Sequence, residues 1–412
     1  MPGGVTRTVA FYDPHPVAFV RGSGAQLEDA DGNLYIDVLN NYTALVHGNA
    51  HPRLTSAAAN ALRDGGIFPA PHSLQVEHAR RILSRFPAAA RVRYTNSGTE
   101  AAMLAVRVAR ALTGRDAIAK ARGAYHGTYD ALWSHVGGQS EAEGAEARQP
   151  GVAKAVHALT HVFEFNDVDS IQTLEKSAGH HLAAIIVEPL LAAAGALLAT
   201  PEFLAACREV CDRTGALLIF DEVQTSRLEM GGLQEHFGIW PDLTVLGKWI
   251  GGGLPIGAVA GTAAAMGALA AGSRTFVNHS GTFNGNGASL AAGLAAIDLL
   301  DASAIRQINA HGDSLAASIR SALASRGMRG SVTGYGSLIN VHFGIDHPSR
   351  VSDTNTSDLQ AMDWFHLALL THGMFAAHRG MMNVSTALGD DGVVEAAKRV
   401  ERALDSVRET SM

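Results

Sequence analysis

The chain has 412 residues, of which 47% are hydrophobic, and this is enough for two or more packed layers and predicts two domains. The net charge is −7 and the 32 basic residues are scattered, so we see no basic stripe of the kind that binds nucleic acid. No run reaches the ~18–20 apolar residues of a membrane helix, and the N-terminus lacks the charged-then-apolar order of a signal peptide.

The N-terminal part is expected to be extended after a proline-rich start, apart from one hairpin. Its turn is Asp31-Gly32-Asn33, and the paired segments are Gln26–Glu28 and Leu34–Val38. Farther along, the alanine-rich segment Thr99–Leu112 predicts a helix that ends at Gly114, a suitable left-handed cap. The polar segment Val136–Gly151 is expected to be a long surface loop.

Two short apolar runs, Ala184–Val187 and Leu217–Phe220, are rich in β-formers and end beside acidic residues. They predict strands that are buried on both faces of a mostly parallel sheet. The helix expected over Glu202–Arg213 carries both cysteines, Cys207 and Cys211, four positions apart. Two cysteines cannot form a disulfide framework, so we interpret them as small buried side chains and expect a reducing cytoplasm.

The C-terminal part predicts helices over Leu290–Ile308 and Asp313–Arg326 and then a strand over Ser337–Phe343. A shift in composition near residues 295–300 predicts a domain boundary. Because strands and helices alternate along most of the chain, the expected fold class is α/β.

Lys248 is the most unusual of the five lysines because it lies between an apolar segment and the triple glycine Gly251–Gly253. A buried ammonium is costly unless it is paired or neutralised, and a neutral lysine amine can attack a carbonyl group. The alternative is a lysine whose stem packs while its head reaches solvent. Lys120, which follows an apolar run, is the next candidate. The others are expected to be solvated: Lys154, Lys176 and Lys398.

Three further segments indicate chemistry. Ser97, Gly98 and Thr99 precede a helix and could bind a phosphate dianion at its N-terminus, although an ordinary helix cap explains them too. Asp221 ends a buried strand, where α/β sheets bind ligands, and a protonated pyridine nitrogen would suit it; a helix cap or a surface ion pair is the alternative.

The third segment is Tyr125-His126-Gly127, which could stack on a flat cofactor or could be a half-buried aromatic loop. Competing motifs are absent: Trp249 stands where a phosphate-binding loop needs Ser or Thr, and the sequence contains no dinucleotide fingerprint, zinc motif or hydrolase elbow. We therefore expect no metal.

Together these residues resemble the class III aminotransferases of fold type I, in the branch that includes glutamate-1-semialdehyde aminomutase. The similarity runs from Pro2 to about Thr386. Its strongest segments are Tyr94–Ala101 (YTNSGTEA), Tyr125–Gly127, Val187–Pro189, Phe220–Gln224 (FDEVQ), Leu246–Gly253 (LGKWIGGG) and Ser280–Asn286 (SGTFNGN).

The resemblance implies pyridoxal 5'-phosphate as the cofactor. Lys248 matches the lysine that forms the Schiff base, and Asp221 matches the aspartate paired with the pyridine nitrogen. Ser97, Gly98 and Thr99 match the phosphate loop.

The remaining matches surround the cofactor. Tyr125 matches the aromatic residue that stacks on the ring, with His126 beside it among the cofactor-binding residues, and Val223 matches the residue on the opposite face. Glu188 is expected near the polar edge of the ring, and Gln224 near the phenolic oxygen. Thr282 matches a threonine that reaches the phosphate of the neighbouring subunit, which implies a homodimer with shared active sites.

The N-terminus departs from the aminomutase pattern. Arg7 has appeared, and Ala10 stands where the aminomutases have arginine. This arrangement is instead similar to the β-phenylalanine and β-amino-acid aminotransferases, whose arginine at this position binds the substrate carboxylate. Arg379 matches their second arginine.

The resemblance implies a fold type I pyridoxal-phosphate-dependent transferase, with a mostly parallel central sheet in a large domain and a small α+β domain built from both termini. The expected divisions are an N-terminal arm with part of the small domain (1–45), the large cofactor-binding domain (46–295) and the C-terminal small domain (296–412).

The leading functional hypothesis is a transaminase that moves an amino group from a β-amino acid or related amine to an α-keto acid such as pyruvate or 2-oxoglutarate. The alternatives are a 2,1-aminomutase, which needs no separate acceptor, an ω-amine transaminase, and a cofactor-binding regulator without turnover. The absence of a helix-turn-helix extension and the presence of both Lys248 and Asp221 argue against the regulator.

Overall fold

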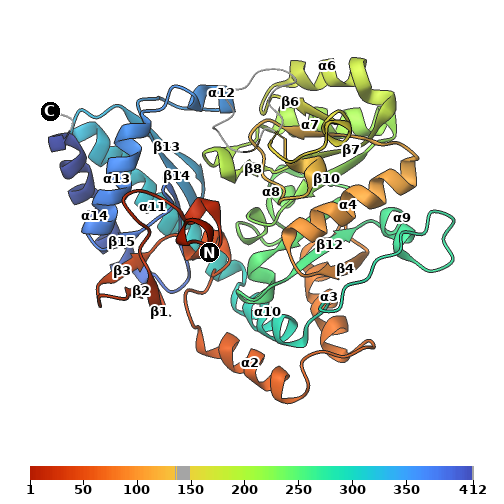
Figure 1. Cartoon of the computed structure of the whole chain (residues 1–412), viewed down its shortest axis with the longest axis horizontal. Coiled ribbons are helices and arrows are strands. Elements are labelled where there is room, and N and C mark those ends of the chain that lie inside the picture. Colours follow the sequence, from red (N-terminus) through yellow and green to blue (C-terminus); the bar gives the residue numbers. More distant parts are fainter. Residues whose placement is uncertain (135, 137–148, 411–412) are drawn as a thin grey trace.

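The computed structural model describes residues 1–134, 136 and 149–410. The loop expected over Val136–Gly151 therefore lies largely outside the described residues. Figure 1 shows a mixed α/β molecule in which helices and strands of the middle of the chain form one lobe and both ends of the chain contribute to the other.

A seven-stranded sheet in the order β4-β12-β11-β10-β7-β5-β6 forms the centre of the larger lobe. Its strands are β4 (Arg91–Thr95), β5 (Ala117–Ala121), β6 (Thr160–Phe163), β7 (Leu182–Val187), β10 (Leu217–Asp221), β11 (Leu243–Gly247) and β12 (Gly257–Gly261). Only β12 runs against its neighbours in this sheet. The mostly parallel sheet and its two predicted strands, β7 and β10, are confirmed.

Apolar side chains on both faces of these strands explain their continuous hydrophobic runs. On β7, Ile186 packs in the cluster formed with α4, whereas Ile185 packs in the cluster formed with α6 and α7. The covering helices are α4 (Gly98–Thr113), α6 (Val168–Ala178) and α7 (Pro201–Thr214). Gly114 caps α4 in the left-handed region as predicted, and both cysteines are buried free thiols on α7.

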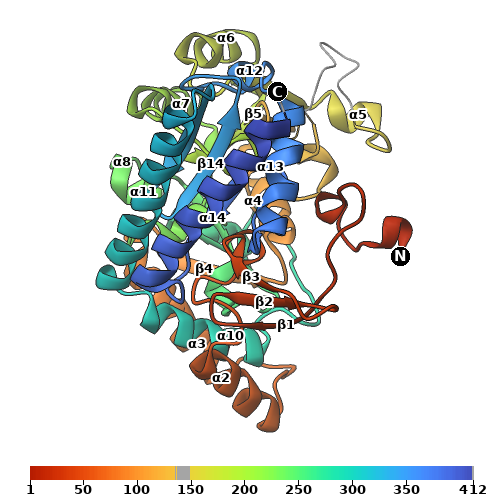
Figure 2. The same ribbon diagram turned by 90° about the vertical axis from the view of Figure 1, so that its left-hand side faces the viewer.

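The second lobe is built from both ends of the chain. One sheet joins β1 (Phe19–Ser23), β2 (Gln26–Asp29), β3 (Leu34–Asp37) and β15 (Met374–Phe375), and another joins β13 (Gly330–Tyr335), β14 (Leu338–Phe343) and β16 (Met381–Asn383). The long helices are α11 (Ala302–Ser325), α13 (Leu359–Thr371) and α14 (Gly389–Thr410). Figure 2 shows α14 between α11 and α13, with which it packs. The predicted hairpin is confirmed, because β2 and β3 are antiparallel and Gly32 has a φ of 85°.

The predicted break between the C-terminal helices is wrong. Helix α10 (Gly287–Leu299) ends nine residues before the expected Ile308, and α11 runs without interruption through Gly312. Asp301 starts α11 because its side chain accepts a hydrogen bond from the N–H of Ala304 at 2.8 Å. Gly312 is required for packing, since a Cβ there would lie 2.1 Å from the carbonyl oxygen of Gly336.

The remaining elements are shorter or lie at the edges of the two lobes. They are α1 (Asn40–Thr43), α2 (Pro52–Arg63), α3 (Ser73–Arg85), α5 (Lys154–His157), β8 (Leu190–Leu191), β9 (Leu197–Leu198), α8 (Leu233–Phe237), α9 (Ala263–Met266) and α12 (Val351–Thr354). Helices α2 and α3 pack on α10. We propose that residues 46–295 form the large domain and that residues 1–45 and 296–412 form the small one.

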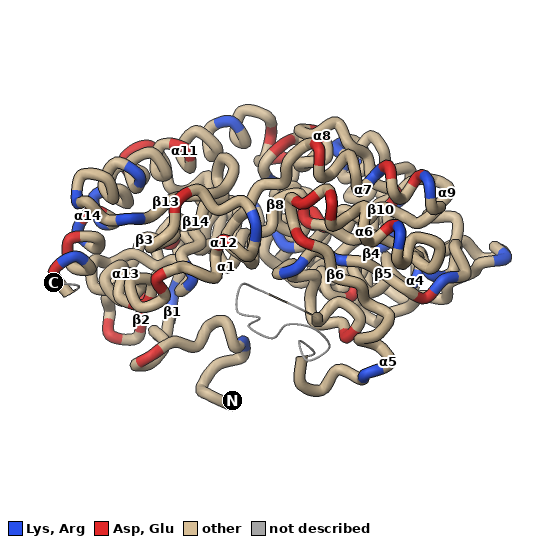
Figure 3. The backbone as a smooth tube through the Cα atoms, turned by 90° about the horizontal axis from the view of Figure 1, so that it is seen from above, with Lys and Arg blue, Asp and Glu red and all other residues tan. Residues whose placement is uncertain are grey.

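In the described part of the chain no single helix is long and apolar enough to cross a membrane, whereas α10 and α11 together, bent by 77°, meet that test of length and composition. Figure 3 shows Lys and Arg spread over both lobes and interspersed with Asp and Glu.

Candidate active site

The predicted site residues gather because they follow the carboxyl ends of parallel strands, which meet at one edge of the sheet. Ser97 follows β4, Tyr125 follows β5, Glu188 follows β7, Asp221 ends β10 and Lys248 follows β11. The antiparallel strand β12 contributes none of these residues. Electrostatic interactions join Lys248 to both Asp221 and Glu188, and join Tyr125 to the same two carboxyl groups.

Lys248 is a half-buried residue with a φ of 56°, which is rare for a side chain larger than glycine. Burial lowers the pKa of its amine to about 7, although the nearby Asp221 and Glu188 oppose that shift. At neutral pH a large share of the Lys248 amine is therefore unprotonated and nucleophilic.

Lys120, the other candidate, is held in a structural role by hydrogen bonds to the backbone. Its buried Nζ donates to three carbonyl oxygens, those of Ala124 at 2.8 Å, Leu132 at 3.0 Å and Ser134 at 2.7 Å. Burial lowers the pKa of this amine to about 7 as well. However, three acceptors aimed at three N–H bonds hold the ammonium form and leave no free electron pair. The other lysines are exposed: Lys154, Lys176 and Lys398.

Asp221 is buried, and its carboxylate is oriented by two donors. His126 Nδ1 lies 2.8 Å from Asp221 Oδ2, and the N–H of Val223 donates to Oδ1 at 3.1 Å. Burial lowers the pKa of His126, so the ring is neutral and gives its one proton to Asp221. His126 thus lies against the Asp221 carboxylate, while its buried Nε2 has no partner among the described residues.

Glu188 is the second buried carboxyl group of the cluster. Its oxygens accept hydrogen bonds from the N–H of Tyr125 at 3.0 Å and of Ala192 at 3.4 Å. Burial, and then the nearby Asp221, raise the pKa of Glu188 to about 8. At neutral pH Glu188 is therefore mostly a neutral acid that can donate a hydrogen bond.

The N-terminus of α4 forms a cradle of small residues. Ser97 is the N-cap, and its hydroxyl accepts from the N–H of Glu100 at 3.2 Å, whereas the first N–H groups of the helix, at Gly98 and Thr99, have no intrahelical partner. The neighbouring loop needs glycine, since a Cβ on Gly127 (φ 82°) would lie 2.2 Å from Thr99 Oγ1. These N–H groups can hold an anion such as a phosphate.

Val223 closes one side of this cradle, because a Cβ added to Gly98 would meet its Cγ2 at 3.2 Å. Gln224, the next residue, is buried, and its side-chain oxygen has no partner in the described part of the chain. A bound ligand with a polar group at this place would satisfy that amide.

Tyr125 is 39% exposed, and its ring meets that of Trp133 edge-on with centroids 5.9 Å apart. Its accessible ring is therefore available to a flat ligand. Thr282 is exposed on the loop before α10, and no interaction found in the described residues joins it to the cluster. This chain alone thus leaves Thr282 outside the site.

Arg7 and Arg379 both lie over one residue that the sequence did not indicate, Tyr42. The guanidinium carbons are 5.6 Å and 5.4 Å from the centre of its ring. Arg7 is exposed on an N-terminal arm that Figure 2 shows standing away from the β1–β3 sheet, and it donates to Asn41 Oδ1 at 2.8 Å. Burial lowers the pKa of Arg379, and neither arginine forms a salt bridge with any described acid.

Glu222, which follows Asp221, is also missing from the sequence prediction of the site, and its role is structural. This fully buried carboxylate accepts from the N–H groups of Leu233 and Gln234, at 3.0 and 2.9 Å, and from Thr225 Oγ1. A run of two acids at a strand end does not reveal which one faces the ligand, whereas the donors around Glu222 do.

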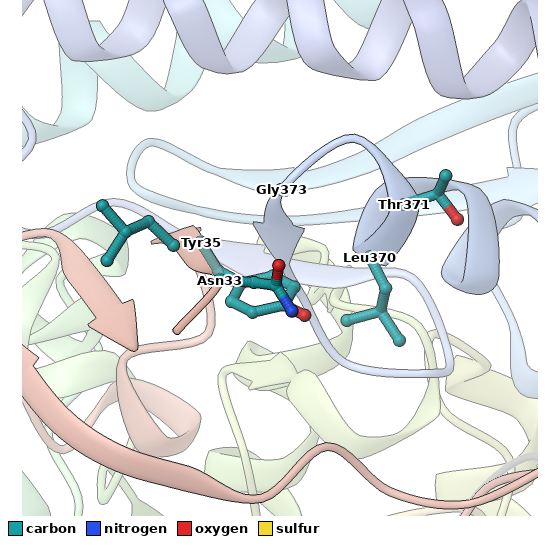
Figure 4. Close-up of a pocket in the computed structure, with 6 residues that line it drawn as sticks. Asn33, Tyr35, Leu370, Thr371 and Gly373 are labelled. Atoms are coloured by element: carbon teal, nitrogen blue, oxygen red, sulfur yellow. The ribbon is translucent and has the colours of Figure 1, made fainter. Parts of the chain in front are cut away.

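A separate surface pocket, seen in Figure 4, lies on the small domain between the hairpin and the end of α13. Its lining residues are Asn33, Leu34, Tyr35, Leu370, Thr371 and Gly373. The one ionisable group there, the Tyr35 hydroxyl, donates to Asp29 at 2.8 Å, so the pocket offers no reactive group.

The cluster at the strand ends fits pyridoxal 5'-phosphate. The α4 cradle suits a phosphate, the Asp221 carboxylate suits a cationic ring nitrogen, and the amine of Lys248 suits an aldehyde. The unpartnered amide of Gln224 suits a further polar substituent.

Comparisons with known proteins agree with this fit. Residues 9–388 match the family described as aminotransferase class-III. The chain is 39% identical to a glutamate-1-semialdehyde 2,1-aminomutase of Methanopyrus kandleri over 92% of this chain and 87% of that protein.

Solved structures with the same architecture include two transaminases. An omega-transaminase from Sphaerobacter thermophilus has a TM-score of 0.94 and 37% identity, and it covers 99% of this chain and 95% of its own. A beta-phenylalanine aminotransferase from Variovorax paradoxus has a TM-score of 0.89 and 34% identity, with coverage of 97% and 90%.

Proposed function

The chain belongs to the class III aminotransferase family, and on that premise we propose that it transfers an amino group from a β-amino acid to an α-keto acid such as pyruvate or 2-oxoglutarate. Its fold is that of the fold type I pyridoxal-phosphate enzymes, and its cofactor is pyridoxal 5'-phosphate. When bound, this cofactor supplies a ring that withdraws electrons from the carbon next to the substrate nitrogen.

The residues at the strand ends have separate roles in this proposal. The Lys248 amine would hold the cofactor covalently and then move a proton at the substrate carbon, for which a pKa of about 7 is suitable. Asp221, oriented by His126, would keep the ring nitrogen protonated, and neutral Glu188 would donate at the polar edge of the ring. Tyr125 and Val223 would cover its two faces.

The phosphate would be held by the N-terminus of α4, with Ser97, Gly98 and Thr99. The buried amide of Gln224 would lie near the phenolic oxygen.

The observation that supports the substrate class is the pair of guanidinium groups over Tyr42. Arg7 and Arg379 lack acidic partners among the described residues, and Arg379 has a buried Nε without any acceptor. An unpaired buried guanidinium is costly, so a substrate carboxylate is the expected partner.

Two such groups suit a transaminase of this kind. The carboxylate of a β-amino acid is one carbon farther from the reacting nitrogen than that of an α-amino acid, so one fixed arginine cannot serve both substrates equally well. We assign Arg7 to the carboxylate of the β-amino acid and Arg379 to the carboxylate of the α-keto acid, each as a bidentate donor.

The second candidate is an aminomutase of the glutamate-1-semialdehyde type, which the name of the Methanopyrus relative favours. The identity values do not separate the two functions, because proteins named as transaminases share 34% and 37% of their residues with this chain. The N-terminal arginine favours the transaminase, since an aminomutase binds one substrate and needs no second carboxylate site. An ω-amine transaminase would accept amine donors without a carboxylate, which Arg7 would not bind.

A donor panel with and without keto acid tests the proposal. We expect β-amino acids to be used only when pyruvate or 2-oxoglutarate is present, with one keto acid consumed for each amine. Multiple turnovers of glutamate-1-semialdehyde without any acceptor would instead establish the aminomutase.

Arginine variants test the assignment of the two carboxylates. Arg7→Ala should raise the KM of the β-amino acid about ten- to a hundredfold and change that of the keto acid far less, whereas Arg379→Ala should do the reverse. These factors correspond to the ~1.5–3 kcal/mol of a hydrogen bond to a charged group. Equal effects on both substrates in both variants would contradict the separate assignments, and a carboxylate-free amine as the best donor would contradict the substrate class.

We also propose a homodimer with shared sites. Large apolar side chains are exposed on two segments, Ile67 and Phe68 on one and Phe276 and Phe283 on the other. The segments touch, since the N–H of Gly287 donates to the carbonyl of Gly66 at 2.6 Å. A second copy that covers this face would receive Thr282 near its phosphate cradle. The proposed location is the cytoplasm.

A further inference from the structure

The turn that presents Tyr42 has an unusual backbone. The four residues of α1, Asn40, Asn41, Tyr42 and Thr43, all have positive φ angles, of 47°, 47°, 55° and 73°. Asparagine adopts this region at low cost, but a tyrosine and a β-branched threonine do so only under constraint. Such strain persists where the surroundings fix it, and it concentrates at functional sites.

Buried hydrogen bonds fix the turn. Asp37 Oδ1 accepts from the N–H groups of Leu39 and Asn40 at 3.0 and 2.7 Å. Asn383 donates from its side chain to the carbonyl of Leu39 at 2.5 Å, and its own carbonyl accepts from the Asn40 side chain at 2.8 Å. The position of Tyr42 is therefore set by residues on β3 and β16, and the Tyr42 side chain makes none of these bonds.

Tyr42 meets Arg379 because their strands are parallel neighbours. Strands β3 and β15 pair with Ile36 opposite Met374, so the chain leaves both strands at the same edge of the sheet. Tyr42 follows shortly after β3, and Arg379 follows shortly after β15. The Tyr42 hydroxyl also donates to the carbonyl of Val9 at 3.1 Å, two residues beyond Arg7.

We propose that Tyr42 is the positioning residue that holds both Arg7 and Arg379 in place, so that the site can bind the carboxylate of either substrate without moving these two side chains. The inference rests on the proposed function, because it assumes that both guanidiniums bind substrate. The ring face attracts both cations, and the hydroxyl ties the arm that carries Arg7 to the body of the protein.

Two parts of the side chain make separable contributions. The ring contacts both arginines. Loss of a cation–π contact should raise the KM of the substrate that the arginine binds by between about two- and thirtyfold, depending on how buried the contact is. The hydroxyl acts only on the arm. The substitution Tyr42→Leu should therefore weaken both substrates, whereas Tyr42→Phe should weaken only the β-amino acid.

The test compares KM and kcat for both substrates in the cofactor-loaded dimer of each variant. We expect Tyr42→Leu to raise the KM of the β-amino acid and of the keto acid severalfold each, with kcat changed far less. Tyr42→Phe should raise the KM of the β-amino acid alone, and Tyr42→Trp should restore the KM of the keto acid because its ring binds cations at least as well.

Asn41→Gly is the matched control, because glycine keeps the left-handed turn and removes only the acceptor of Arg7. It should raise the KM of the β-amino acid and leave that of the keto acid unchanged. Cofactor absorbance and thermal midpoint of each variant show whether the fold and the loaded state are retained; an amine without a carboxylate should keep its KM in all of them.

The outcomes separate this inference from the proposed function. If the arginine variants show the expected KM changes but Tyr42→Leu leaves both KM values unchanged, the positioning role of Tyr42 is wrong and the substrate assignment stands. If Tyr42→Leu lowers kcat for every donor, including the carboxylate-free amine, Tyr42 supports the site in general and not the arginines. If the arginine variants have no effect, the substrate assignment itself fails.

Discussion

The buried carboxyl group of Glu188 gives a prediction about how stability depends on pH. Its pKa rises from an ordinary value of 4.5 to about 8 in the folded chain, because of burial first and the nearby Asp221 second. Between these values the unfolded chain releases the proton of Glu188 and the folded chain keeps it. The group therefore destabilises the folded state progressively as pH rises from about 4.5 to about 8, and no further above that.

The substitution Glu188→Gln removes this ionisation while keeping the shape of the side chain. The free energy of unfolding of the variant, relative to that of the original chain, should increase by about 1.4 kcal/mol for each pH unit in this interval. From pH ~5.5 to ~7.5 the relative gain is thus about 2–3 kcal/mol. The loss of hydrogen bonding is small, because an amide oxygen still accepts from the N–H of Tyr125 and the contact with Ala192 is long, at 3.4 Å.

Urea unfolding of the cofactor-free protein at the two pH values, at one protein concentration, measures this difference. Glu222→Gln is the comparison variant: burial also raises the pKa of that carboxyl group, but several donors converge on it and an amide nitrogen would face one of them. We expect it to lower stability by about 1–3 kcal/mol at the lower pH and to recover part of that loss as the pH rises. A Glu188→Gln effect that is the same at both pH values would refute the argument, because it would mean that Glu188 is ionised in the folded chain.

The other predictions concern the chemistry. Borohydride reduction of the loaded enzyme followed by peptide mapping should find the pyridoxyl group on Lys248, and label on Lys120 would overturn the assignment. Lys248→Ala should abolish multiple turnovers. Asp221→Asn should fold normally but slow proton transfer by orders of magnitude, at ~1.4 kcal/mol for each factor of ten; near-normal turnover would remove Asp221 from the mechanism. An equimolar mixture of Lys248→Ala and Thr282→Ala chains, after subunit exchange, should regain about a quarter of the normal activity, since about half of the dimers are mixed and each of these has one complete site. No gain on mixing, or a fully active monomer, would contradict the shared site.

The sequence by itself determined the elements whose signals are local. Strand β7, and β10 up to its terminal Asp221, carry apolar residues at every position because both faces of a parallel sheet are covered. Gly114 and Gly32 mark a helix end and a turn by backbone freedom alone. The order of the segments around Lys248 and Asp221 identified the family. The break between α10 and α11 was misplaced, because the close approach of Gly336 to Gly312 leaves no mark on helical periodicity.

Only the tertiary structure decided which partners, and therefore which role, each of these side chains has. Lys120 is buried and Lys248 half-buried, both after apolar runs, and they differ in the three carbonyl groups that accept hydrogen bonds from Lys120. The pairing of His126 with Asp221 depends on β5 and β10, which have only β7 between them in the sheet, and the pairing of Tyr42 with Arg379 depends on the neighbouring strands β3 and β15. A sequence records which groups are present. The distances between them, and therefore their charges and partners, are set only when parallel strand ends meet at one edge.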